Sequence, residues 1–154
     1  MTRVLFGLLT RDGDRLGHLV RAVQMLRSYG NEAKIMRYSD VMDWCGHADE
    51  PPAMCCMLEC MSDADMEGLS GIARETQWAL GDEDKVLQVY IMQFGNERFQ
   101  EAPPPLQALL EEKTLACMSR VKEAHEFAQM CDWGQQFMGE DVDVAGEWPS
   151  ATGR

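Results

Sequence analysis

The sequence predicts a single α/β domain in which a parallel sheet is flanked by helices. Short apolar runs bounded by turn residues recur as far as Gly95, and runs with helical spacing separate them. The resulting order is strand, helix, strand, short helix, strand, helix, strand. Strands that alternate with helices in this way are typical of right-handed crossovers within a parallel sheet.

The first part of the chain contains four of these elements. Residues 3–10 form an apolar run that predicts a buried strand, and Arg11–Asp14 follow as a turn. Apolar residues then recur at helical spacing over residues 16–28, and Gly30 stands where a helix C-cap is expected. Residues 32–38 alternate as a second strand would, and residues 41–44 predict a short helix capped by Ser39 or Asp40.

The central stretch, residues 53–80, predicts a strand, a tight loop and an amphipathic helix. The strand, residues 54–61, is apolar apart from Glu59 and is closed by prolines before it and Ser62-Asp63 after it. The helix has one apolar stripe, made by Leu69, Ile72, Ala73, Thr76 and Leu80. Residues 85–92 then form the most strand-like segment of the chain.

The last third predicts a long helix over about residues 104–133, because prolines at 103–105 suit its first turn. A single domain would therefore cover residues 1–133, and residues 134–154 would form a mobile acidic tail. The helix offers a dimer seam or docking face made by Leu106, Leu109, Leu110, Cys117, Val121 and Ala124.

The order of elements over residues 1–95, together with Met66-Glu67-Gly68-Leu69 after a buried strand, resembles response-regulator receiver domains. That resemblance implies a flavodoxin-like parallel sheet and a phosphoacceptor aspartate about eight residues before Gly68. Cys60 stands at that position, and Glu59 is one residue out of register, which places it on the other face of the strand. The resemblance is therefore to a receiver that has lost its phosphorylation site.

Other receiver positions are altered as well. The resemblance implies a Mg²⁺-binding acidic pair at Asp12 and Asp14, although Asp-Gly-Asp is also ordinary turn chemistry. It implies Ser or Thr where Gln93 stands, and a Lys-Pro pair that the sequence lacks. The degenerate pocket would comprise Asp12, Asp14, Glu59, Cys60 and Gln93, with no catalytic residue, cofactor or metal assigned.

Charge and cysteine content narrow the classes of partner. The net charge of -12 opposes binding to nucleic acid and to anionic membranes, and favours a basic protein surface or a partner not selected by charge. No apolar run approaches the roughly 20 residues of a membrane span. Six cysteines without framework spacing predict free thiols and a cytoplasmic location.

Three functions remain open from the sequence. The first is a non-enzymatic regulatory or scaffolding module that acts by protein–protein contact, with another protein or as a homodimer. The second is a small flavodoxin-like ligand-binding protein or enzyme that uses the carboxyl end of the sheet near Asp12, Asp14 and Cys60. The third and weakest, a metal or redox sensor, would use Cys45, Cys55, Cys56 and Cys60, although small buried hydrophobic side chains are the better explanation of those residues.

Overall fold

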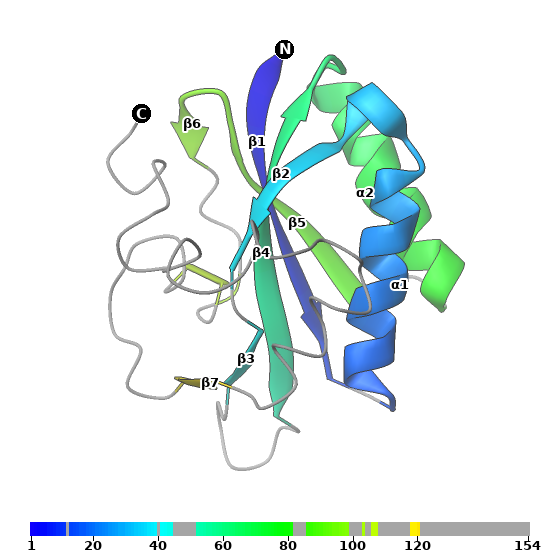
Figure 1. Cartoon of the computed structure of the whole chain (residues 1–154), viewed down its shortest axis with the longest axis vertical. Coiled ribbons are helices and arrows are strands. Elements are labelled where there is room, and N and C mark those ends of the chain that lie inside the picture. Colours follow the sequence, from blue (N-terminus) through cyan, green and yellow to red (C-terminus); the bar gives the residue numbers. More distant parts are fainter. Residues whose placement is uncertain are drawn as a thin grey trace.

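A computed structural model of the chain describes residues 1–11, 13–39, 41–44, 52–81, 86–98, 103, 106–107 and 118–120. Two helices lie side by side against one face of a twisted sheet, and β1 and β4 run through its centre (Figure 1). The elements follow in the order β1 (Thr2–Thr10), α1 (Arg15–Arg27), η1 (Gly30–Glu32), β2 (Lys34–Tyr38), β3 (Met42–Trp44), β4 (Ala53–Ser62), α2 (Met66–Leu80), β5 (Leu87–Phe94), β6 (Glu97–Arg98) and β7 (Met118–Arg120).

The sheet is antiparallel, so the predicted parallel flavodoxin-like and receiver-like sheet is wrong. Its seven strands run β6-β5-β1-β4-β3-β7, and β2 also pairs with β4. Every pairing among the described strands is antiparallel. The long strands thus follow a β-α-β-β-α-β order in which β4 lies between β1 and β2, and β1 lies between β4 and β5. This is the split β-α-β, or ferredoxin-like, arrangement.

One short segment explains why β4 runs antiparallel to its neighbours and not parallel to them. The short helix predicted over residues 41–44 is wrong, because Met42–Trp44 form β3 and pair with the first residues of β4. Ser39 lies between β2 and β3 in the chain and is also bonded to β4. Its backbone amide donates to the carbonyl of Met57 at 2.8 Å, and its hydroxyl accepts from the amide of Met57 at 2.8 Å. The chain therefore enters β4 from a strand rather than from a crossover helix, and a strand that folds back on its predecessor is antiparallel.

The two faces of the sheet carry two separate apolar clusters. We call the face under α1 and α2 the helix face and the other the opposite face. Side chains alternate along β1 and β4, so that Phe6 and Leu58 pack on the helix face while Leu5 and Met57 pack on the opposite face. The buried cluster of the opposite face comprises Leu5, Leu9, Met42, Ala53, Cys55, Met57, Met92 and Leu106.

Local sequence signals explain where the two helices begin. The Asp14 carboxylate accepts from the amide of Gly17 at 3.1 Å, and the Asp65 carboxylate accepts from the amide of Gly68 at 2.8 Å. Each aspartate therefore satisfies an amide that the first turn of its helix leaves without an intrahelical partner. The strand, loop and helix predicted over residues 53–80 are confirmed as β4 and α2.

The predicted C-terminal helix over residues 104–133 is wrong at its centre. The amides of Leu106 and Gln107 both donate to the carbonyl of Pro103 at 3.0 Å, as in a helical turn. Met118–Arg120, however, form β7 and pair with β3. The other residues of that range, including Leu109, Leu110, Cys117, Val121 and Ala124, lie outside the described residues, as do the domain boundary at 133 and the tail at 134–154. Across the described part of the chain, we find no helix with the length and apolar character that a membrane crossing requires.

Candidate functional site

Two residues of the pocket predicted at the carboxyl end of a parallel sheet, Asp14 and Cys60, lie far apart. Thr10 at the end of β1 pairs with Met54, whereas Cys60 pairs with Val4 near the start of β1. Six residues of strand separate the two pairs, which is about 20 Å. Asp14 follows the end of β1 and caps α1, so it lies far from Cys60. Asp12 lies outside the described residues.

The described cysteines are buried thiols. Burial, and then the neighbouring Glu59 carboxylate, raise the pKa of Cys60 on the helix face. Burial, and then Asp43, raise the pKa of Cys55 to about 12. Both side chains stay protonated at neutral pH, because burial disfavours the thiolate. Cys56 is also buried on the helix face, and Cys45 lies outside the described residues. Within the described ranges, no three His, Cys, Asp or Glu side chains are grouped to hold a metal ion.

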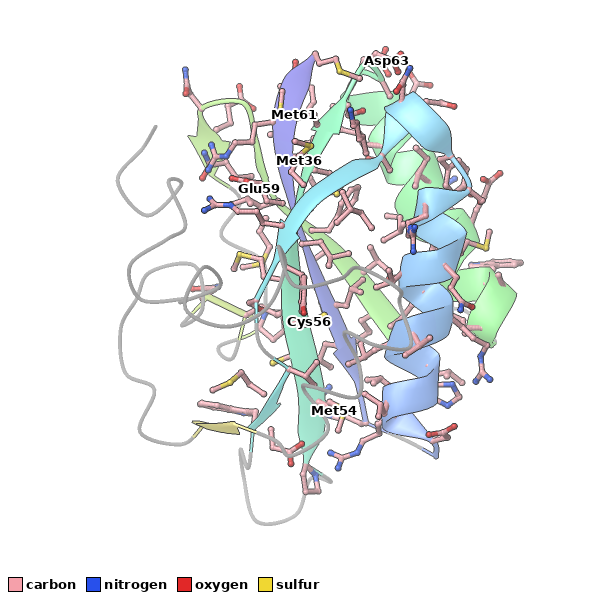
Figure 2. The ribbon with its side chains drawn as sticks, in the orientation of Figure 1. Met36, Met54, Cys56, Glu59, Met61 and Asp63 are labelled. Atoms are coloured by element: carbon pink, nitrogen blue, oxygen red, sulfur yellow. The ribbon has the colours of Figure 1, made fainter. Side chains whose placement is uncertain are left out.

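Glu59 is the centre of an ionic cluster on the opposite face. Leu5 on β1 pairs with Glu59 on one side and with Gln93 on the other. Glu59 pairs in turn with Arg37 on β2. Directly paired residues project to the same face, and so does Arg3, which lies two residues before Leu5. Figure 2 shows Glu59 projecting away from α1 and α2.

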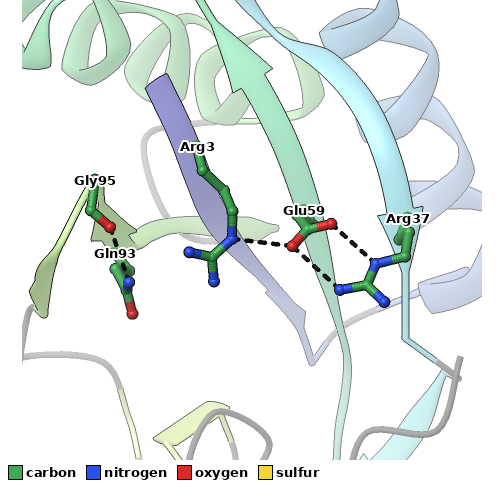
Figure 3. Close-up of polar contacts among 5 residues, drawn as sticks. All are labelled: Arg3, Arg37, Glu59, Gln93 and Gly95. Atoms are coloured by element: carbon green, nitrogen blue, oxygen red, sulfur yellow. Dashed lines mark hydrogen bonds and ion pairs between the residues drawn. The ribbon is translucent and has the colours of Figure 1, made fainter. Parts of the chain in front are cut away.

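Two arginines hold the Glu59 carboxylate from opposite sides (Figure 3). Arg37 donates from Nε to Oε1 at 2.9 Å and from Nη2 to Oε2 at 3.2 Å, which is a bidentate contact. Arg3 donates from Nε to Oε2 at 3.0 Å. The Glu59 side chain is 10% exposed, against 18% for Arg3 and 29% for Arg37. The carboxylate is therefore the buried centre of the cluster, and Arg37 is the more exposed of its two partners.

A third cation extends the cluster along the same face. Lys34 pairs with Met61, two residues beyond Glu59 on β4, and is exposed. We call Arg3, Lys34, Arg37 and Glu59 the basic patch. The patch contains three cationic side chains and one carboxylate, so it is positive although the whole chain carries -12. Met36, at the β-bulge between Ile35 and Arg37, is also exposed.

Gln93 borders the basic patch and has one unsatisfied atom. Its Nε2 donates to the carbonyl of Gly95 at 2.9 Å, as Figure 3 shows. Its Oε1 is buried and has no hydrogen-bond partner among the residues that the structure describes. A buried acceptor of this kind costs stability unless a water or another donor reaches it. Gln93 is thus the described side chain of this face with an unused acceptor.

Sequence reasoning singled out Glu59 and Gln93 but missed the three cations. Arg3 on β1 is far in the sequence from Lys34 and Arg37 on β2, and the three come together only because β4 lies between β1 and β2. Alternation along each strand could have placed each cation on a face. The strand order that makes those faces continuous leaves no local signal.

No protein-family model matches the sequence, and no curated protein matches it significantly. The site is therefore interpreted from its own geometry and charge.

Proposed function

We propose that this chain is a non-enzymatic binding module that acts by protein–protein contact through the opposite face of its sheet. The observation that carries the proposal is the basic patch. A positive cluster on an acidic chain favours a partner that presents carboxylates. The exposed side chains of Lys34 and Met36 provide the accessible part of this surface.

The chemistry of the described interior supports binding rather than catalysis. Among the described residues, Glu59 is the one buried carboxylate, and it already accepts from two guanidinium groups. The buried thiols Cys55 and Cys60 have raised pKa values and are poor nucleophiles. These groups hold the fold in place, whereas Lys34 is exposed and Arg37 is partly exposed.

The proposal is tested with a fluorescein-labelled peptide in which glutamate alternates with leucine. We expect binding at low ionic strength that weakens as salt shortens the Debye length from about 30 Å to about 8 Å. Lys34→Gln should lower the affinity about threefold, the scale of one exposed charge. The matched control is Arg21→Gln, because Arg21 is exposed on α1, on the other side of the molecule.

Two results would contradict the proposal. One is equal binding of a peptide with lysine in place of glutamate, which would mean that charge does not select the partner. The other is an equal loss of affinity in Arg21→Gln, which would move the contact away from the basic patch. Sedimentation of the protein alone shows whether a second copy is the partner, since a dimer that dissociates in salt would compete with the peptide.

A small-molecule ligand is the second candidate function, and the unsatisfied Oε1 of Gln93 favours it. A ligand with a hydrogen-bond donor would satisfy this atom. Native mass spectrometry of the purified protein tests the idea, because a retained ligand adds a defined mass that Gln93→Met removes. If the mass equals that of the chain alone and Gln93→Met is as stable as wild type, this candidate fails.

A further inference from the structure

A stripe of four residues runs along the side of α2 that points away from the sheet. The buried side of this helix is made by Leu69, Ile72, Ala73 and Thr76. On the opposite side, residues recur at intervals of four, three and four, and they are Glu67, Gly71, Arg74 and Trp78. Residues three or four apart are neighbours on a helix surface, so these four form one continuous line, which we call the α2 stripe.

Trp78 gives the stripe a large apolar side chain. Its exposed fraction is 61%, whereas Leu69 and Ile72 on the other side of α2 are buried. A tryptophan side chain can remove about 150–250 Å² from water, and most of this gain is unused in the single chain. Tryptophan is also among the residues that contribute most to binding at protein interfaces. A partner surface is therefore indicated at this end of the stripe.

Gly71 leaves the middle of the stripe without a side chain. A Cβ atom at Gly71 would meet no other described part of the fold within 4 Å, so packing does not require glycine at this position. Glycine inside a helix costs about 0.5–1 kcal/mol relative to alanine. A second helix can, however, come close to the backbone of α2 at this point, because interhelical distances depend on the side chains at the contact.

Two opposite charges flank Gly71 on the stripe. Glu67 lies four residues before it and Arg74 three residues after it, and both side chains are exposed. Neither makes an ion pair with any residue that the structure describes. The neighbouring Glu75 lies off the stripe, and its carboxylate accepts from the hydroxyl of Tyr29. The stripe thus offers one negative and one positive charge for a contact with another molecule.

This order of charges is complementary to itself when two α2 helices pack antiparallel. Glu67 and Arg74 are seven residues apart, which is about two helical turns, so they lie along the same edge of the stripe. A two-fold axis at Gly71 places that edge against the same edge of the second copy. Glu67 of each copy then faces Arg74 of the other, and the contact contains two ion pairs. Trp78, seven residues beyond Gly71, would lie over the start of the second α2, near the small side chain of Ala64.

We propose that two copies of this chain form a dimer through the α2 stripe, with the α2 helices antiparallel and crossing at Gly71. Charge complementarity favours a second copy as the occupant, because the stripe supplies both halves of each ion pair. Figure 1 shows α1 and α2 together on one side of the sheet, so the dimer leaves the basic patch open and does not depend on the proposed function. A contact made by one helix from each copy falls below a standard interface of about 1,600 Å², so the dimer is weak and depends on concentration.

Sedimentation velocity over a range of protein concentrations tests the dimer. Wild type should show a dimer fraction that rises with concentration, whereas Trp78→Ala and Gly71→Leu should be monomeric at the same concentrations. Gly71→Leu keeps the fold intact, because a side chain at this position meets no described neighbour. Met36→Ala is the control, since it removes an exposed apolar side chain of β2 and should leave the dimer unchanged.

Two results would overturn the proposal. One is a wild-type chain that stays monomeric up to about 1 mM. The other is a dimer that persists in Trp78→Ala and Gly71→Leu, which would place the contact between the copies on another surface.

Exchanging the two charges tests the antiparallel pairing. Glu67→Arg or Arg74→Glu alone puts like charges opposite each other, so each should weaken the dimer about tenfold. The double variant has opposite charges again, with their positions exchanged, and should recover wild-type dimerisation. Arg21→Glu, on the exposed surface of α1, makes the same change in net charge as Arg74→Glu and should have no effect. A folded double variant that dimerises as weakly as the single variants would overturn this pairing.

The dimer and the proposed function can fail separately, because the α2 stripe and the basic patch lie on different sides of the sheet. Sedimentation and the binding of the peptide of alternating glutamate and leucine are therefore measured on the same protein. If the chain dimerises through the stripe but binds no peptide, the proposed function fails and the dimer stands. If the chain binds the peptide but stays monomeric up to about 1 mM, the dimer fails and the proposed function stands.

Discussion

The two faces of the sheet differ in the kinds of side chain that they carry. The helix face is an aliphatic and aromatic cluster in which Phe6, Leu58 and their neighbours are sealed by α1 and α2. The opposite face contains three methionines, Met42, Met57 and Met92, together with Gly7 and the ionic cluster around Glu59. Methionine adapts to changing neighbours, and charged groups favour partners of opposite sign. The helix face is therefore suited to stabilising the fold, and the opposite face is suited to contact with a partner.

The largest effect is expected on the helix face. Phe6→Ala removes a fully buried ring from the centre of that cluster. Large-to-small changes of this kind lower the free energy of unfolding by about 3–5 kcal/mol, because the packing contacts are lost and a cavity remains. Urea denaturation followed by circular dichroism measures the loss. A loss below about 1 kcal/mol would mean that the helix face is not the main source of stability.

The next effect is on the ionic cluster of the opposite face. Glu59→Gln keeps the shape of the side chain but removes the charge that holds Arg3 and Arg37. Breaking such a pair leaves like charges together in a half-buried site, so unfolding should become easier by about 2–3 kcal/mol. Glu97→Gln is the control, because Glu97 is an exposed carboxylate on the short edge strand β6. A stabilised Glu59→Gln protein would show that the cluster serves binding at a net cost to folding.

A smaller effect on stability is expected at Ser39, which lies between β2 and β3. Ser39→Ala removes the hydroxyl that accepts from the amide of Met57, and this amide is buried. A buried amide left without its partner costs about 1–2 kcal/mol. Ser70→Ala on α2 provides a matched serine outside the sheet and should change stability by less than about 0.5 kcal/mol. Equal losses in the two variants would mean that the Ser39 bond does not support the edge of the sheet.

The smallest effect concerns the outer surface of the helix face, where Tyr29 donates to Glu75 at 2.5 Å. Burial, and then the bond to Glu75, raise the pKa of Tyr29 from 10.0 to about 12. A raised pKa means that the folded state favours the protonated phenol, so its stabilising contribution is complete below pH 10 and is lost as the pH rises toward about 12. Tyr29→Phe should remove that part of the alkaline loss in melting temperature. Parallel melting curves for the two proteins over this range would contradict the assignment.

The longer elements of the first 95 residues could be predicted from the sequence, but the directions of the strands could not. The strand before α1, the strand before α2 and both helices are where apolar periodicity puts them. The prediction failed for the long C-terminal helix, where Met118–Arg120 form β7, and at residues 41–44, where four residues, too few to show a period, were interpreted as a helix. A helix at that place would connect two parallel strands, so the interpretation led to the prediction of a parallel sheet. A strand at the same place sends β4 back antiparallel between β1 and β2.

The candidate site was predictable only in part, for the same reason. Glu59 was conspicuous as the one charge in an apolar strand, whereas the cations that pair with it come from β1 and β2. Their meeting depends on strand order, which is set by packing over the whole domain. The pocket expected from Asp14 and Cys60 failed because an antiparallel sheet sends the ends of neighbouring strands to opposite edges.

The central position of β1 has a consequence for how the protein is made. This strand leaves the ribosome well before both of its neighbours, β4 and β5, which lie much later in the chain. At a synthesis rate of about 5–20 residues per second, its apolar edges wait several seconds for their partners. The nascent chain therefore cannot fold strand by strand, and nearly all of the domain must emerge before its centre is complete. A stall before β5 would leave an apolar strand open to chaperones or to other nascent chains.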